Sequence, residues 1–213
     1  MNLRFLLFTL LLPALLLCGC ATTPQTVGTG PQSVVMLITP GTTKVWDSFG
    51  GFIKFKKDKK PLRVVIALRE DAAPETVANF KELIRRRYYD GMSFHRLFPH
   101  LLVQTGDPKS RHGESDRSGT GGPGYTLPSE IRLKLDAGAV VASRLPDALN
   151  PTRASNGSQF FICLEPMPQL DGHYTVFGKV TEGLDVLDFI STLPVDSNDF
   201  PLEKVVIKSI KLE

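Results

Sequence analysis

Apolar and polar residues alternate along several short stretches of this chain, which is the pattern of half-buried β-strands. Residues 51–56 and 61–68 both alternate in this way, and the charged stretch 57–60 between them suits the tip of a β-hairpin. A short apolar run at 34–38 is a further candidate strand. Other apolar runs, separated by loops rich in Gly and Pro, predict strands at 101–104, 139–143, 159–164, 175–180 and 205–210.

Two segments follow the spacing of a helix instead. After Pro74 and Glu75, which suit a first helical turn, apolar residues recur on one face from Val77 to Ile84, and three arginines follow. A second, shorter helix is predicted over 183–190. Many short strands with only two helices predict a mainly β fold, built as a closed antiparallel barrel with helical caps.

Composition narrows the class of protein. The chain has 213 residues, of which 42% are hydrophobic, so it can bury a core and is not disordered throughout. A net charge of +3 is too small to indicate a nucleic-acid partner. Three cysteines are too few for a disulfide scaffold, and the four histidines lack metal-ligand spacing, so we expect no metal site. Cys163 lies in an apolar run and is expected to be an inert, buried thiol.

The first residues predict a targeting segment. Arg4 precedes an apolar run at 5–17, which is too short to span a bilayer as a helix and has the length typical of a signal peptide. A transmembrane anchor is the alternative. The stretch LCGC at 17–20 resembles the bacterial lipobox, in which a small residue precedes the cysteine that receives lipid. This resemblance implies a signal peptide over 1–19 and lipid attachment at Cys20.

The residues after Cys20 predict a tether to a membrane. Residues 21–33 are uncharged and rich in Thr, Pro, Gly, Gln and Ser, so we assign 20–49 to the lipidated cysteine, a flexible tether and an extension. Two or three acyl chains anchor a protein stably, which makes the lipid membrane an expected partner. By resemblance to lipoproteins of Gram-negative bacteria, Ala21 favours the outer membrane, with the protein facing the periplasm.

Five short motifs carry a family resemblance. They are FHRLFP at 94–99, QTGDP at 104–108, NGSQFFI at 156–162, LDG at 170–172 and VFGKV at 176–180. In this order and at this spacing the motifs resemble those of the cyclophilins, which are peptidyl-prolyl cis-trans isomerases. The resemblance runs from about residue 51 to residue 213. It implies that 50–213 form a cyclophilin-like isomerase domain, a closed eight-stranded antiparallel barrel capped by two helices, with no cofactor.

The chemistry of prolyl isomerisation explains what such a site must supply. Rotation about a peptide bond faces a barrier of about 18–20 kcal/mol, because the C–N bond has partial double-bond character. The twisted state loses this resonance, and its nitrogen becomes a better hydrogen-bond acceptor. An enzyme therefore needs a fixed donor and an apolar pocket for the proline ring, and it needs no covalent step.

The resemblance also implies roles for individual residues. Arg96 is the expected catalytic donor, Phe161 is the floor of the proline pocket, and Gln104 bonds the substrate backbone and orients Arg96. The expected walls of the pocket are Leu101, Leu102 and Leu170. The other expected substrate-binding residues are Gln159, Tyr174, Ser143 and Arg144, of which the last two would pair with the substrate backbone.

A few positions depart from the best-known cyclophilins. Leu101 and Leu102 replace Phe and Met, and Gln169 stands where many members carry Trp, so weak cyclosporin binding is expected. We expect an enzyme that isomerises exposed X–Pro bonds in proline-containing segments of envelope proteins and thereby assists their folding. The alternatives are a tethered module that only captures such segments, and a structural envelope lipoprotein built on a reused barrel.

Overall fold

The computed structural model describes residues 32–39, 44–46, 52–54, 61–112 and 119–213. The compact unit that contains them runs from Pro31 to Glu213. The predicted signal peptide, Cys20 and nearly all of the predicted tether lie outside the described residues. Within the described part, no helix is both long enough and apolar enough to cross a membrane.

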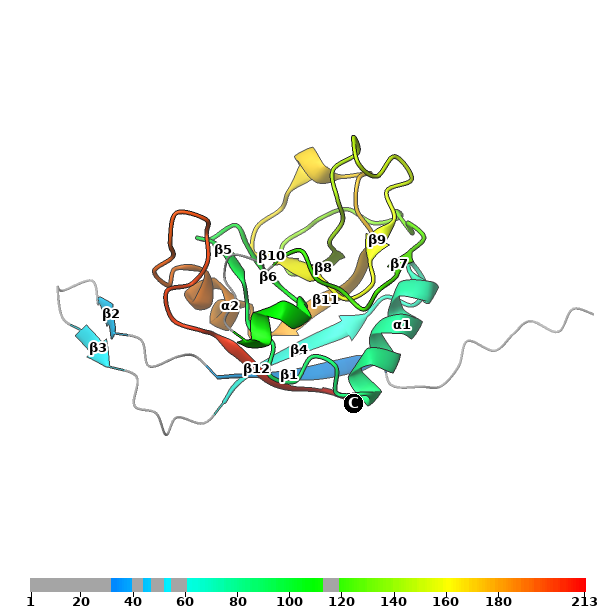
Figure 1. Ribbon diagram of the computed structural model, residues 1–213. Coiled ribbons are helices and arrows are strands. Elements are labelled where there is room, and N and C mark those ends of the chain that lie inside the picture. The colour runs from blue at the N-terminus through cyan, green and yellow to red at the C-terminus, as the bar shows by residue number, and fades with distance from the viewer. Residues whose placement is uncertain (1–31, 40–43, 47–51, 55–60, 113–118) are drawn as a thin grey trace, which may run out of the picture. The chain divides into compact units, whose positions relative to one another are not determined.

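One antiparallel sheet contains most of the strands. In chain order its strands are β1 (Ser33–Thr39), β4 (Leu62–Leu68), β5 (Arg96–Phe98), β6 (Leu102–Thr105), β8 (Ala139–Ala142), β10 (Phe160–Cys163), β11 (Val176–Glu182) and β12 (Val206–Leu212). They are arranged in the order β12-β1-β4-β11-β8-β10-β6-β5 (Figure 1). All the strands predicted after residue 100 are present, with bounds shifted by one or two residues.

The sheet is strongly curled but open, so the predicted closed barrel is wrong. β12 and β5 lie at the two ends of the strand order and are not paired with each other. Across this seam, the segment before β5 makes one isolated bridge, between Ser93 and Val206, and a few backbone hydrogen bonds. β5 has only 3 residues, and the turn before it contains Gly91 with φ of 80°, so the segment does not form a continuous ladder with β12. The described residues thus form a half-barrel with two α-helices.

The predicted hairpin over 51–56 and 61–68 is also wrong. β3 (Phe52–Lys54) pairs with β2 (Lys44–Trp46), whereas β4 pairs with β1 and β11. β4 is largely buried, and such a strand is stabilised by apolar neighbours on both sides more than by a short charged hairpin. β1 lies between β12 and β4, so a strand within 20–49, the predicted extension, is part of the sheet.

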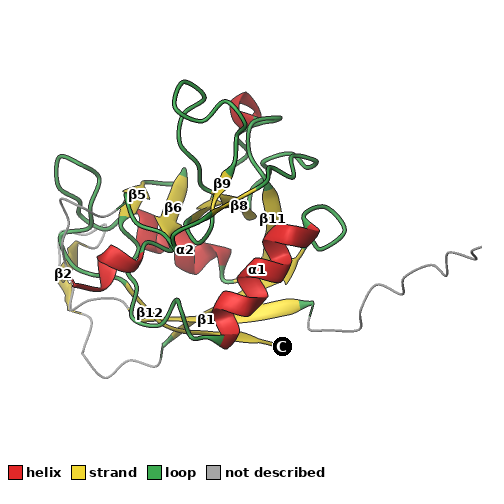
Figure 2. Cartoon of the chain, turned by 45° about the vertical axis from the view of Figure 1, so that its right-hand side comes forward, coloured by secondary structure: helices red, strands yellow, loops and turns green. Residues whose placement is uncertain are grey.

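The two helices lie where the sequence pattern places them. α1 (Pro74–Arg85) packs against β11 and β12, and α2 (Leu184–Ser191) packs against β4, β5 and β6 (Figure 2). Smaller elements, too short to be predicted from the apolar spacing, complete the fold. They are the strand pair β7 (Thr126–Leu127) and β9 (Ser155–Asn156), and the 3-10 helices η1 (Pro108–His112) and η3 (Pro168–Leu170).

A carboxylate from a distant loop caps α1. The residue before the helix, Ala73, has no side chain that could accept a hydrogen bond from the first turn. Glu130 supplies this acceptor, because its carboxylate accepts the backbone N–H of Glu75 at 3.1 Å and that of Thr76 at 2.9 Å. The hydroxyl of Thr76 donates to the same carboxylate at 2.8 Å. Glu130 thus ties the loop at residue 130 to the helix.

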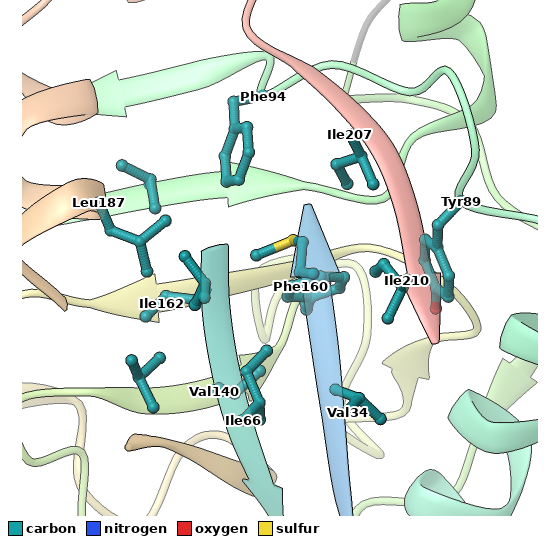
Figure 3. Close-up of a cluster of buried hydrophobic side chains, with 14 of the residues drawn as sticks. Val34, Ile66, Tyr89, Phe94, Val140, Phe160, Ile162, Leu187, Ile207 and Ile210 are labelled. Carbon is teal, nitrogen blue, oxygen red and sulfur yellow. The ribbon is translucent and has the colours of Figure 1, made fainter. Parts of the chain in front are cut away.

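The sheet separates two clusters of buried apolar side chains. The larger cluster lies inside the curl, and Figure 3 shows part of it, with residues from several strands, Tyr89 and Phe94 from the segment before β5, and Leu187 from α2. Successive residues of a strand point to opposite faces, so Phe160 belongs to the inner cluster and Phe161 to the smaller, outer one. The outer cluster also contains Cys163, and burial raises the pKa of its thiol to about 12. Its burial agrees with the inert thiol predicted from the sequence.

Candidate active site

Three residues predicted for the site lie in one row across the sheet. Arg96 on β5 is opposite Gln104 on β6, and Gln104 is opposite Phe161 on β10. The row continues to Val141 on β8. Residues directly opposite each other in neighbouring antiparallel strands have their side chains on the same face. The strand register therefore brings the expected donor, the polar residue and the pocket floor together on the outer face.

Apolar side chains surround Phe161 on this face. Phe161 is only 6% exposed, and its ring meets that of Tyr174 edge-on, with 5.5 Å between the centroids. The expected wall residues are partly buried against the same outer cluster, and they are Leu101, Leu102 and Leu170. The residues predicted to bind a proline ring therefore lie in one cluster, although they come from separate parts of the chain.

A chain of side-chain amides connects the row to a neighbouring loop. Gln104 donates through Nε2 to Oε1 of Gln159 at 3.0 Å, and Gln159 donates through Nε2 to the carbonyl of Gly121 at 2.7 Å. Within the described residues, the side chain of Gln104 forms no hydrogen bond with the side chain of Arg96. The contacts of Arg96 are an ion pair with Asp199, at 3.7 Å between Nη2 and Oδ2, and the ring of Phe98, at 4.8 Å from Cζ to the centroid.

Two residues that the sequence analysis did not single out hold this loop in place. Asp107 is fully buried, and its carboxylate accepts the backbone N–H of Lys109 at 2.8 Å, of Gly121 at 2.9 Å and of Gly119. Asn156 donates through Nδ2 to the carbonyl of Gly121 at 3.1 Å. Both residues stand beside glycines in the motifs, a pattern typical of turns stabilised by Asp or Asn side chains.

Asn156 also shapes the turn that precedes β10. Its Oδ1 accepts the backbone N–H groups of Ser158 and Gln159, each at 2.9 Å. Asn79 on α1 donates through Nδ2 to the carbonyl of Gly157 at 2.7 Å, and Ser158 donates through Oγ to the carbonyl of Gly106 at 2.8 Å. The bond to Asn156 fixes the backbone of Gln159. The bonds to Gln104 and Gly121 orient its side chain before any substrate binds.

Ser143 and Arg144 differ in their availability to a substrate backbone. The N–H of Ser143 donates to the carbonyl of Gln159 at 3.0 Å, and its carbonyl accepts the N–H of Asn156 at 2.7 Å. Within the described residues, the backbone N–H and C=O of Arg144 have no hydrogen-bond partner. Only Arg144 therefore has free backbone groups for the extended pairing that the resemblance implies for both residues.

The side chain of Arg144 links Tyr174 to the loop that follows Arg144. Its Cζ lies 4.6 Å from the ring centroid of Tyr174, and its Nε donates to the carbonyl of His173 at 2.7 Å. It forms an ion pair with Asp147, which also pairs with Arg153 at 3.0 Å. The hydrogen bond from Arg144 lowers the pKa of Asp147, and the bond from Arg153 acts in the same direction.

Arg96 and Arg144 both bring positive charge to the site. His95, next to Arg96 in the chain, is 3% exposed, and burial lowers the pKa of its imidazole to about 4, opposed by the negative charge of Asp107. His95 is therefore neutral at pH 7, whereas a guanidinium stays protonated. Within the described residues, no group of three or more His, Cys, Asp and Glu side chains is placed to hold a metal ion.

Comparison with known proteins identifies the family. Residues 52–212 match the model of the cyclophilin type peptidyl-prolyl cis-trans isomerase/CLD family. The chain is 44% identical over 123 residues to peptidyl-prolyl cis-trans isomerase B of Bacillus subtilis, which covers 58% of this chain and 79% of that protein. It is 38% identical over 152 residues to peptidyl-prolyl cis-trans isomerase ppi1 of Schizosaccharomyces pombe, covering 70% and 93% respectively.

A longer relative and a solved structure support the same family assignment. Peptidyl-prolyl cis-trans isomerase-like 2 of Rhizopus delemar is 35% identical over 205 residues, which is 90% of this chain but only 36% of that protein. The crystal structure of a cyclophilin type isomerase of Cryptosporidium parvum has a TM-score of 0.66 and 26% identity, and covers 86% of this chain and 98% of that chain. The chain therefore belongs to the cyclophilin-type peptidyl-prolyl cis-trans isomerase family, and it is an isomerase of that class.

Proposed function

We propose that the outer face of the half-barrel catalyses rotation about X–Pro bonds, with Arg96 as the hydrogen-bond donor to the twisted peptide. The row from Arg96 through Gln104 to Phe161 carries this proposal, because it places a cation beside an apolar floor. A proline ring on Phe161 would bring its nitrogen within reach of the guanidinium. A donor fixed before the reaction favours the twisted state over both planar ones and so lowers the barrier.

The binding surface suits a proline with an extended flanking chain. Phe161, Leu101, Leu102, Leu170 and Tyr174 would enclose the ring. Gln104 and Gln159 would bond the peptide, together with the free backbone groups of Arg144. The Cryptosporidium parvum relative was also crystallised in the presence of the dipeptide Ala-Pro, which supports a proline-containing ligand for this chain.

The catalytic assignment is tested by replacing Arg96 with alanine. Loss of a preorganised donor at a reacting centre typically lowers the rate by about 10²–10³-fold, so we expect kcat/KM for a prolyl tetrapeptide to fall by about a hundredfold. Arg69→Ala is the matched control, because Arg69 is an exposed arginine that also pairs with an aspartate. Equal rates for the wild type and Arg96→Ala would remove Arg96 from the mechanism. Retained peptide binding by an inactive wild type would favour the capture module.

We also propose that the isomerase is anchored in a bacterial envelope through lipid on Cys20, at the outer membrane facing the periplasm, and acts on proline-containing segments of envelope proteins. The support is the lipobox-like LCGC, the apolar run before it and Ala21 after it. Uncatalysed X–Pro isomerisation takes about 10–100 s, so it can limit folding in that compartment. Cys20→Ser should release the protein from membranes on fractionation, and metabolic labelling with palmitate should be lost. Persistent attachment would favour a transmembrane anchor.

A further inference from the structure

Arg96 has a charged neighbour that lies outside the five family motifs. Nη2 of Arg96 lies 3.7 Å from Oδ2 of Asp199, and the two side chains are 51% and 36% exposed. The same guanidinium lies 4.8 Å from the ring centroid of Phe98, which is two residues along β5. The ring and the carboxylate both contact the guanidinium, and within the described residues no other acidic side chain forms an ion pair with it.

The loop that carries Asp199 is ordered by its own hydrogen bonds and is bonded to β5. Asp196 accepts the backbone N–H of Asn198 at 2.8 Å and that of Phe200 at 3.1 Å through its Oδ1. The carbonyl of Asp199 accepts the N–H of Leu97 at 3.1 Å, so the loop covers the free edge of β5 one residue away from Arg96. Asp199 has φ of 65°, a left-handed conformation that Asp and Asn tolerate better than most residues.

We propose that Asp199 is a positioning residue for prolyl isomerisation, which holds the guanidinium of Arg96 in the orientation that the twisted peptide requires. The proposal rests on the catalytic role proposed for Arg96. A guanidinium has five N–H donors, so an ion pair through Nη2 leaves other donors free to face the peptide. Holding the long side chain before substrate binds removes rotamer freedom that would otherwise be lost in the transition state.

The test compares Asp199→Asn with the wild type in a prolyl-peptide isomerisation assay on the full chain. Asparagine keeps the tolerance for the left-handed backbone and removes only the charge. Partly exposed ion pairs contribute little, so we expect kcat to fall by about two- to fivefold. KM should be unchanged, because Asp199 orients Arg96 and does not touch the peptide.

Two further measurements separate this role from a merely structural one. In an Arg96→Ala background, Asp199→Asn should have no additional effect on kcat. With an uncharged peptide, the activity of the wild type should fall between about 0.01 and 1 M salt, where the Debye length shrinks from about 30 to 3 Å. The activity of Asp199→Asn should not depend on salt. Asp71→Asn, which removes a carboxylate paired with Arg69, is the control and should behave as the wild type.

Three outcomes would overturn the proposal. Asp199→Asn could be as active as the wild type or more active, it could lower kcat equally in the Arg96→Ala background, or it could keep the salt dependence of the wild type. If Arg96→Ala itself retains full activity, the catalytic role of Arg96 fails and the role of Asp199 fails with it. If Arg96→Ala loses activity but Asp199→Asn does not, Arg96 keeps its proposed catalytic role and only the positioning role of Asp199 fails.

Discussion

Gly121 connects the loop that Asp107 holds to the candidate active site, because it bonds both Asp107 and Gln159. A Cβ atom at this position would overlap Oδ1 of Asp107 and lie 3.0 Å from its Cγ and 3.2 Å from Cγ of Lys109. Asp107 is fully buried and its carboxylate already accepts three backbone N–H groups, so it has little room to move. In Gly121→Ala, the loop must therefore shift away from Asp107.

The magnitude follows from the hydrogen bonds that such a shift breaks. The N–H of Gly121 donates to Asp107 at 2.9 Å, and a bond to a charged acceptor contributes about 1.5–3 kcal/mol. We expect the free energy of unfolding to fall by about that amount, measured by urea unfolding followed by far-UV circular dichroism. The carbonyl of Gly121 also accepts from Gln159, so kcat/KM for a prolyl peptide should fall as well.

Gly124→Ala in the same loop is the control for backbone strain. A Cβ there meets no atom within 4 Å, but φ is 93°, so the variant should lose about 1 kcal/mol of stability and keep its activity. A Gly121→Ala variant with the stability and the activity of the wild type would refute the coupling. Loss of stability with full activity would refute the link from the loop to Gln159.

Three further predictions concern stability and binding. Glu130→Gln should lower the melting temperature, because a neutral amide accepts the N–H groups of Glu75 and Thr76 less strongly, and the loss should be about 1–2 kcal/mol. For His95, stability should decrease as pH falls from about 6.5 to about 4, because the unfolded chain then binds a proton that the buried imidazole does not. His95→Gln should flatten this part of the pH profile of unfolding. Asp147→Ala should raise KM severalfold in the isomerisation assay, because Arg144 and Arg153 lose their shared partner.

Each of these has a result that would contradict it. For Glu130, the contradicting result is an unchanged melting temperature in Glu130→Gln. For His95, it is an equal loss of stability between pH 6.5 and 4 in the wild type and in His95→Gln. For Asp147, a fall in kcat at constant KM would show that the loop acts on the reaction itself and not on binding.

The sequence was informative wherever the signal was local. The apolar spacing from Val77 to Ile84 predicted α1, and short apolar runs predicted β6, β8, β10, β11 and β12, because the period of two or 3.6 residues belongs to each element alone. It failed for the hairpin over 51–56 and 61–68. There, the partner of β4 was decided by which distant strands could bury it, and these are β1 and β11.

For the candidate site, too, the sequence predicted some features and the structure decided others. The order and spacing of the motifs were enough to gather Arg96, Gln104 and Phe161 as candidates and to infer the family from them. Their separation in the sequence, however, does not predict which of these residues contact each other. Among the described residues, the side chain of Gln104 bonds that of Gln159 and not that of Arg96. The ion-pair partner of Arg96 comes from a loop about a hundred residues away in the sequence.

By itself, then, the sequence determined the mainly β class, the two helices and the isomerase family, and it supplied candidate residues for binding a proline. Only the tertiary structure decided that the barrel is open, that β1 belongs to the sheet and that Phe161 faces outward beside Gln104 and Arg96. The reason is physical. Periodicity and motif chemistry act between near neighbours in the chain, whereas strand register and the pairing of Arg96 with Asp199 depend on long-range contacts between segments that meet only in the folded molecule.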